Sequence, residues 1–234
     1  MKILALESSA IAASAALCED GKLLGEFTLQ NGNTHSETLL PLAESILRAF
    51  SLSPDQIDLF AVSAGPGSFT GVRIGCATVK GLAFGTGKPC IGVSTLEALA
   101  ENLTLRDGLI CPVMNARRGQ VYTALFRCKD RTLTRLLPDS AMAIGELDAL
   151  LGKYGDEPIS LVGDGYDITV CALTHPVRPT PERLRPQSAY SVAQVAKRMY
   201  DSGIRTDDAE LVSVYLRPSQ AERERLEREN AAKQ

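Results

Sequence analysis

The order of apolar and polar positions along the chain predicts alternating strands and amphipathic helices. In the N-terminal half, short apolar runs bounded by turn residues indicate strands, and apolar positions three and four residues apart indicate helices. The predicted strands are 3–6, 14–18, 23–30, 57–64 and 88–93, and the predicted helices are 35–50, 72–84 and 95–102. The first three strands follow one another through tight turns, which is typical of a meander.

Two features refine these helices. Pro41 lies inside 35–50 and is expected to kink that helix or to move its regular start to a later residue. Ser94 and Glu97 have the spacing of a capping box, which marks the start of 95–102.

The pattern starts afresh in the loop at 104–108, so a domain boundary is predicted there. Beyond it we expect strands at 109–114, 120–126 and 158–162, helices at 144–154 and 189–200, and an extended segment at 211–216. The predicted organisation is an N-terminal subdomain (1–104), a C-terminal subdomain (105–218) and a tail (219–234) whose alternating Glu and Arg residues indicate a solvated helix. The predicted class is α/β.

A strand, a glycine-rich turn and a helix follow one another between Ala61 and Gly81. Glycines at such a junction permit close approach to the backbone, and the free N–H groups of the first helical turn attract an anion, most often a phosphate. The spacing fits neither a P-loop nor a dinucleotide fingerprint. A phosphate site and a tight turn without a ligand therefore both stay open.

Few residues are candidates for catalysis. Glu7 and Ser8 end the first strand, where they could hold a metal-bound water and a phosphate, although a solvated strand end is the commoner case. Arg117 and Arg118 in the turn at 115–119 could face an anion, although a solvated turn is again commoner. The two histidines are far apart and lack neighbouring ligands, so no histidine-based metal site is predicted.

Composition narrows the classes of protein to which the chain can belong. Hydrophobic residues make up 44% and charged residues 23%, as in ordinary globular proteins, and the net charge of −3 argues against a general nucleic-acid binder. Six cysteines without a Cys-x-x-Cys pair indicate reduced thiols. No apolar run is long enough for a signal peptide or a membrane span, so a cytoplasmic protein without membrane association is predicted.

Six segments in order, MKILALESS, HSETLLP, AGPGSFTGVRIG, GVSTLEALA, NARRGQVY and VYLRP, resemble the TsaB (YeaZ) family over nearly the whole chain. The resemblance implies the actin/sugar-kinase/Hsp70 fold, with two α/β subdomains that each contain a mixed sheet. It implies a non-catalytic scaffold subunit, not an enzyme by itself, which works with TsaD and the ATPase TsaE. Together they make N6-threonylcarbamoyladenosine at position 37 of tRNAs that read codons beginning with A.

The resemblance also implies where partners bind. The helices at 35–50 and 72–84 would pair with TsaD or, in the chain alone, with a second copy, and tRNA would be reached only through the complex. The implied partner residues are Leu39, Leu42, Ala43, Ile46, Leu47, Phe50, Val72, Ile74, Gly75, Ala77 and Thr78. The small residues of the second helix and the wide apolar stripe of the first are equally compatible with packing inside the subdomain.

The resemblance implies no catalytic residue, no metal ligand and no intrinsic cofactor, with ATP or ADP held at the junction with TsaD. The candidate phosphate-binding residues are Glu7, Ser8, Gly65, Gly67, Ser68 and Gly71. Two departures weaken metal–nucleotide chemistry: Glu7-Ser8-Ser9 stands where the family has Asp-Thr-Ser, and Asn115 stands where it has Asp. His35 stands alone where TsaD has a metal-binding pair.

Three alternatives remain. An independent small-molecule kinase would need an acid to place magnesium, and Glu7 is the well-placed candidate. A metalloprotease is disfavoured by the missing histidine pair, and a homodimeric regulatory protein stays open.

Overall fold

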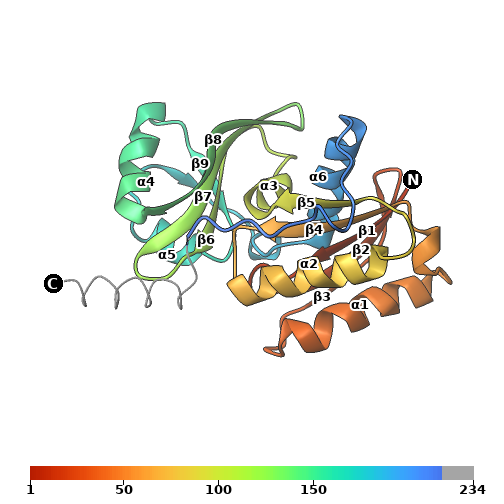
Figure 1. The fold of residues 1–234 in the computed structure, drawn as a ribbon. Coiled ribbons are helices and arrows are strands. Elements are labelled where there is room, and N and C mark those ends of the chain that lie inside the picture. Colours follow the sequence, from red (N-terminus) through yellow and green to blue (C-terminus); the bar gives the residue numbers. More distant parts are fainter. Residues whose placement is uncertain (218–234) are drawn as a thin grey trace, which may run out of the picture.

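The computed structural model describes residues 1–217, within which two five-stranded sheets lie side by side (Figure 1). The first sheet has the order β3-β2-β1-β4-β5, in which β1 to β3 are antiparallel and β1, β4 and β5 are parallel. Its strands are β1 (Lys2–Glu7), β2 (Ala13–Glu19), β3 (Lys22–Leu29), β4 (Leu59–Gly65) and β5 (Cys90–Ser94). The predicted meander is confirmed.

The second sheet repeats this plan with the order β10-β9-β6-β7-β8. Its strands are β6 (Gly108–Asn115), β7 (Gln120–Lys129), β8 (Thr132–Ala143), β9 (Ile159–Val162) and β10 (Val177–Arg178). Two mixed sheets, each with a meander, confirm the expected fold class. The pattern did not predict β8, because this edge strand includes Pro138 and its pairing with β7 is interrupted by register shifts.

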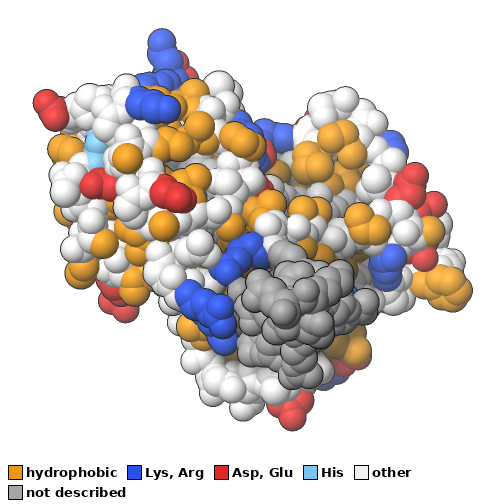
Figure 2. All heavy atoms as spheres, turned by 60° about the vertical axis from the view of Figure 1, so that its left-hand side comes forward, with side chains coloured by type: hydrophobic (Ala, Val, Ile, Leu, Met, Phe, Trp, Pro, Cys, Tyr) orange, Lys and Arg blue, Asp and Glu red, His pale blue; other side chains and the backbone are white. Residues whose placement is uncertain are grey.

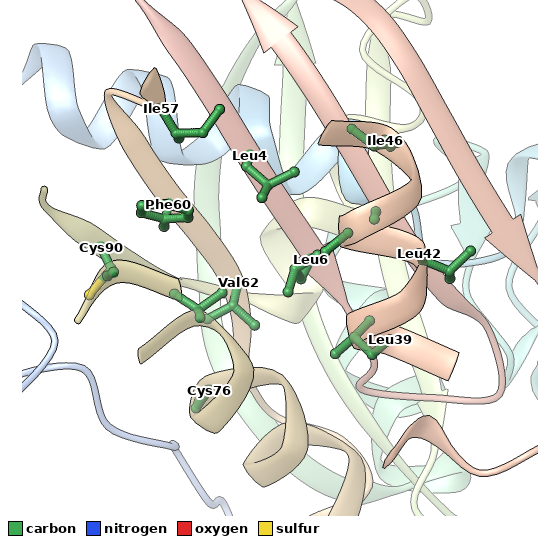
Figure 3. Close-up of a cluster of buried hydrophobic side chains, with 14 of the residues drawn as sticks. Leu4, Leu6, Leu39, Leu42, Ile46, Ile57, Phe60, Val62, Cys76 and Cys90 are labelled. Carbon is green, nitrogen blue, oxygen red and sulfur yellow. The ribbon is translucent and has the colours of Figure 1, made fainter. Parts of the chain in front are cut away.

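Two long helices cover one face of the first sheet: α1 (His35–Ala49) and α2 (Phe69–Ala83). Their apolar side chains meet alternate residues of β1, β2 and β4 in one buried cluster, and Figure 3 shows these side chains between the helices and the sheet. Leu39, Ala43 and Ile46 of α1 have no exposed surface. The apolar stripe of α1 is therefore core.

The starts of the two helices, α1 and α2, are set by their capping residues. Pro41 does not delay α1, which starts at His35 and runs through it, with the Thr34 amide donating to Glu37 Oε2 at 3.4 Å. In α2 the first residue is Phe69 and not the predicted 72, because Ser68 is the N-cap and its hydroxyl accepts from the Gly71 amide at 3.3 Å.

The opposite face of the first sheet is covered by α3 (Thr95–Glu101) and α6 (Ala189–Asp201). Residues such as Val192 and Val195 of α6 pack against Ile3 and Ala5 of β1. After α6 the chain runs back across the first sheet (Figure 1), and the backbone amide of Cys90 donates to the Thr206 carbonyl at 2.9 Å. The predicted C-terminal subdomain of 105–218 includes α6 and the segment after it, and in the structure both pack on the first sheet.

The second sheet carries α4 (Ile144–Leu151) and α5 (Tyr166–Val170) on one side and shares α3 with the first sheet. The predicted helix 144–154 is α4 followed by a 3₁₀ turn, and α5 was not predicted. The 3₁₀ turns are Pro54–Gln56, Gly152–Tyr154 and Glu182–Leu184. In the part of the chain that the structure covers, no helix combines the length and apolarity needed to cross a membrane. All six cysteines are free thiols, and five are buried.

Candidate functional site: the cleft between the two sheets

A cleft of about 570 Å³ lies where the ends of the two sheets meet. Figure 2 shows Lys and Arg side chains gathered near the middle of the face where the two lobes adjoin. Four segments form the walls of the cleft: the residues after β1 (9–11), the glycine-rich loop (66–70), the end of β6 (114–117) and the C-terminal segment (214–217). Tyr122 and Asp164 complete the lining.

The glycine-rich loop is held against the end of β1 at van der Waals distance. A Cβ on Gly67 would stand 2.5 Å from the Ser9 carbonyl oxygen, and one on Gly71 would overlap the Ser8 carbonyl oxygen. The Ser68 amide also donates to Ser9 O at 2.7 Å. Close packing of the loop on its own sheet thus explains these glycines without a ligand.

Gly65 has a different neighbour, which sequence reasoning missed. Its φ is +120°, and a Cβ there would overlap the carbonyl oxygen of Val214. The Val214 amide donates to Ala64 O at 2.7 Å, so the extended segment at 211–217 crosses the loop directly. No sequence pattern relates residues 150 positions apart, so only the fold reveals this contact.

Glu7 is buried away from the cleft. Its carboxylate accepts the Ser9 amide at 2.6 Å and the hydroxyl of Ser63, and none of its surface is exposed. Burial raises the pKa of Glu7, and these hydrogen bonds oppose that rise. Ser8 is equally buried and donates to Gly71 O at 2.9 Å.

Of the six predicted phosphate-binding residues, only Gly67 and Ser68 line the cleft. Glu7, Ser8, Gly65 and Gly71 are not part of the cleft lining, and their role in phosphate binding stays a prediction. Each of these four has a structural partner within the chain.

The charged groups of the cleft come mostly from residues that sequence reasoning missed. Asp164, in a glycine turn after β9, accepts from Gln187 Nε2 at 3.2 Å. Arg217 donates to the Ala116 carbonyl at 3.2 Å and so ties the C-terminal segment to the second sheet. Arg117 lines the cleft and Arg118 does not. The available signals were the glycine turn around Asp164 and, for Arg217, its place in the segment VYLRP.

Both histidines contact backbone carbonyls. The Nε2 atom of His35 lies 2.7 Å from Ala10 O, and that of His175 lies 2.9 Å from Glu157 O. Over residues 1–217, no group of three or more His, Cys, Asp or Glu side chains is placed to hold a metal ion.

The outer surfaces of α1 and α2 differ from the predicted partner surface. Seven of the predicted residues are buried in the core: Leu39, Leu42, Ala43, Ile46, Leu47, Val72 and Gly75. The apolar stripe of each helix faces the sheet, so these seven side chains pack inside the subdomain, and their contact with a partner stays a prediction. Phe50 and Ala77 are exposed, and Ile74 and Thr78 are half-buried. These four keep an outward-facing surface.

Comparisons with known proteins agree on one family. The model of the family described as "TsaD: tRNA N6-adenosine threonylcarbamoyltransferase" matches residues 25–215. The chain is 36% identical over 163 residues to the tRNA threonylcarbamoyladenosine biosynthesis protein TsaB of Bacillus subtilis (strain 168), covering 70% of this chain and 71% of that protein. It is 39% identical to TsaB of Escherichia coli (strain K12), covering 54% of this chain and 55% of that protein.

A solved structure titled "YeaZ from Pseudomonas aeruginosa" has the same fold. It superposes with a TM-score of 0.79 at 24% identity and covers 92% of this chain and 99% of that one.

Proposed function

Because the chain belongs to the TsaB family, we propose that it is a non-catalytic subunit for the synthesis of N6-threonylcarbamoyladenosine in tRNA. In this proposal TsaD transfers the threonylcarbamoyl group to adenosine 37 of tRNAs that read codons beginning with A, and TsaE completes the assembly. The chain acts in the cytoplasm as a scaffold and reaches tRNA only through the complex.

The observation that carries the non-catalytic role is the position of Glu7. Phosphoryl transfer by an enzyme of the actin/sugar-kinase/Hsp70 fold needs an acid at the cleft to place magnesium. The carboxylate of Glu7, at the end of β1, is buried, is bonded to Ser9 and Ser63, and does not line the cleft. The acid that does line the cleft, Asp164, comes from the second subdomain and accepts a hydrogen bond from Gln187 Nε2 at 3.2 Å. This arrangement favours a non-catalytic role for the chain over the role of an independent kinase.

TsaD is the proposed partner because the TsaD family model spans most of this chain, which supports a pair built from two similar folds. The outward surface of α2 offers small side chains, with Ala77 exposed and Gly81 facing open space. Small residues allow another helix to approach closely, which supports docking of a helical face there. The same surface would serve a homodimer when TsaD is absent.

A nucleotide, ATP or ADP, is proposed only at the junction with TsaD. Gly67 and Ser68 line the cleft at the N-terminus of α2, where the positive end of the helix dipole favours a phosphate. Titration calorimetry with magnesium–ADP, on the chain alone and on the complex, tests this. Heat from the complex only is the expected result, and equal binding by the chain alone contradicts it.

The proposed function is tested by size-exclusion chromatography with light scattering, using the chain alone and mixed with cognate TsaD. We expect a one-to-one complex that is weakened by Ala77→Glu, because a buried unpaired carboxylate is costly at an interface. Ala172→Glu, at an exposed alanine beyond α5, is the matched control and should leave the complex intact.

Two results would refute the proposal. One is the absence of any complex under all nucleotide conditions. The other is magnesium–ATP turnover by the chain alone, which would support an independent kinase.

A further inference from the structure

The segment 211–217, here called the strap, is fixed to the first subdomain along its length. Leu211 is buried in the core beside Gly92. The Val214 amide donates to Ala64 O at 2.7 Å, and the Val214 carbonyl lies against Gly65. Arg217 then donates to the Ala116 carbonyl of the second subdomain. The strap is thus held at both ends and in the middle.

Despite these anchors, the strap presents large apolar side chains to solvent. Val212 is 65% exposed, Val214 49% and Tyr215 38%. Large apolar side chains that stay exposed within one anchored four-residue stretch are typical of a surface that another protein covers.

The strap joins the start of α2 through the side chains of Arg73 and Phe69. The Arg73 guanidinium lies 3.9 Å from the centre of the Phe69 ring and 5.8 Å from that of Tyr215, and its Nε donates to Tyr215 Oη at 3.0 Å. The Phe69 and Tyr215 rings lie 4.7 Å apart. These contacts order Arg73 and make the strap and the start of α2 one continuous surface.

This surface is cationic around its apolar centre. The sequences of α2 and of the strap contain Arg73, Lys80 and Arg217 but no acidic residue, although the whole chain has a net charge of −3. Three acids, Asp207, Asp208 and Glu210, precede the strap, and the carboxylates of Asp207 and Glu210 accept hydrogen bonds from each other's backbone amides. A second copy centred by a two-fold axis on Arg73 and the strap, and not on Ala77 and Gly81, would bring like charges together.

We propose that the strap and the N-terminal part of α2 form a docking surface for a different protein, whose facing surface is apolar at its centre and acidic at its rim. The identification of that protein as TsaD rests on the function proposed above. The tail at 219–234 is a poor occupant by composition, because its charges alternate and it lacks an apolar stripe.

The test measures the affinity of the chain for cognate TsaD by titration calorimetry at low and high salt. Val212→Asp should weaken binding by about tenfold or more, as expected for a buried apolar contact, while Leu105→Asp, at an apolar side chain that is 78% exposed, should not. Arg73→Glu should weaken binding and reduce its salt dependence, while Arg183→Glu should do neither.

The outcomes separate the two proposals. If TsaD binds the unmodified chain and Ala77→Glu weakens binding but the strap variants do not, the docking role of the strap is wrong and the proposed function stands. If TsaD does not bind at all, the proposed function fails, and this inference fails with it. A homodimer that Val212→Asp dissociates, or direct tRNA binding that Arg73→Glu abolishes, would overturn the assignment to an acidic protein partner.

Discussion

Replacement of Gly75 by alanine separates two explanations for the small residues of α2. If Gly75 existed to let a partner approach, alanine would stabilise the free chain, because glycine in a helix interior costs about 1 kcal/mol relative to alanine. The structure instead places a Cβ on Gly75 2.6 Å from Ser8 Oγ and 3.0 Å from Val62 Cγ2. Both neighbours are buried, so neither has room to move away.

The magnitude follows from these contacts. Overpacking of a tight core site costs about 1–3 kcal/mol, and rotation of the Ser8 hydroxyl away from its 2.9 Å bond to Gly71 O costs about 1 kcal/mol more. Subtracting the helix-propensity gain of about 1 kcal/mol leaves a loss of about 1–3 kcal/mol in the free energy of unfolding for Gly75→Ala.

Gly81 is the matched control, since it lies in the same helix and a Cβ there meets no atom within 4 Å. Gly81→Ala should raise the free energy of unfolding by about 0.5–1 kcal/mol. Urea unfolding followed by circular dichroism measures both variants. A Gly75→Ala chain as stable as Gly81→Ala would refute the packing explanation and restore the one in which Gly75 serves a partner.

Three further predictions concern the core, a buried acid and a loop anchor. Ile46→Ala should lower the free energy of unfolding by about 2–5 kcal/mol, whereas Leu40→Ala, at a side chain that is 43% exposed on the same helix, should change it little. Equal losses for the two variants in urea unfolding would contradict the assignment of Ile46 to the core. The pKa of Glu7 in the folded chain lies above its ordinary value of 4.5, so the folded state holds that proton more tightly and the contribution of Glu7 to stability falls as pH rises from 4.5 through the folded pKa. Urea unfolding across this range should show that the stability of the wild-type chain declines relative to that of Glu7→Gln. A stability difference that stays constant with pH would contradict this prediction. Asn102→Ala should lower the free energy of unfolding by about 1–3 kcal/mol, because the side-chain Nδ2 of Asn102 donates to two carbonyls of the loop before α6 at 2.9 and 2.8 Å and its Oδ1 accepts a serine hydroxyl at 2.6 Å. Thermal unfolding measures the loss, and an unchanged midpoint would show that these hydrogen bonds are dispensable.

The sequence was informative wherever local pattern determines structure. Short apolar runs bounded by turn residues located the meander, and helical spacing located α1 and α6 to within a residue or two. Where the local signal was weak, prediction failed: β8 contains a proline and an irregular register, and the five-residue helix α5 is too short to show a periodicity.

The candidate site was predicted less well, because a residue's type does not say which surface it faces. Glu7 and Ser8 have the right chemistry at the right strand end, yet both point into the wall behind the cleft. Asp164 and Arg217 face it from segments far away in the sequence. The wide apolar stripe of α1 was compatible with a core or with a partner, and the sheet beneath it decided for the core.

The sequence by itself therefore determined the family, the α/β class and most of the elements, because these depend on motifs and short-range periodicity. Tertiary structure alone decided that α6 and the strap return to the first subdomain, that the glycines are packed against β1 and Val214, and that Arg73 links α2 to the strap. These are contacts between segments distant in the chain, and their energies depend on atomic distances that residue order does not encode.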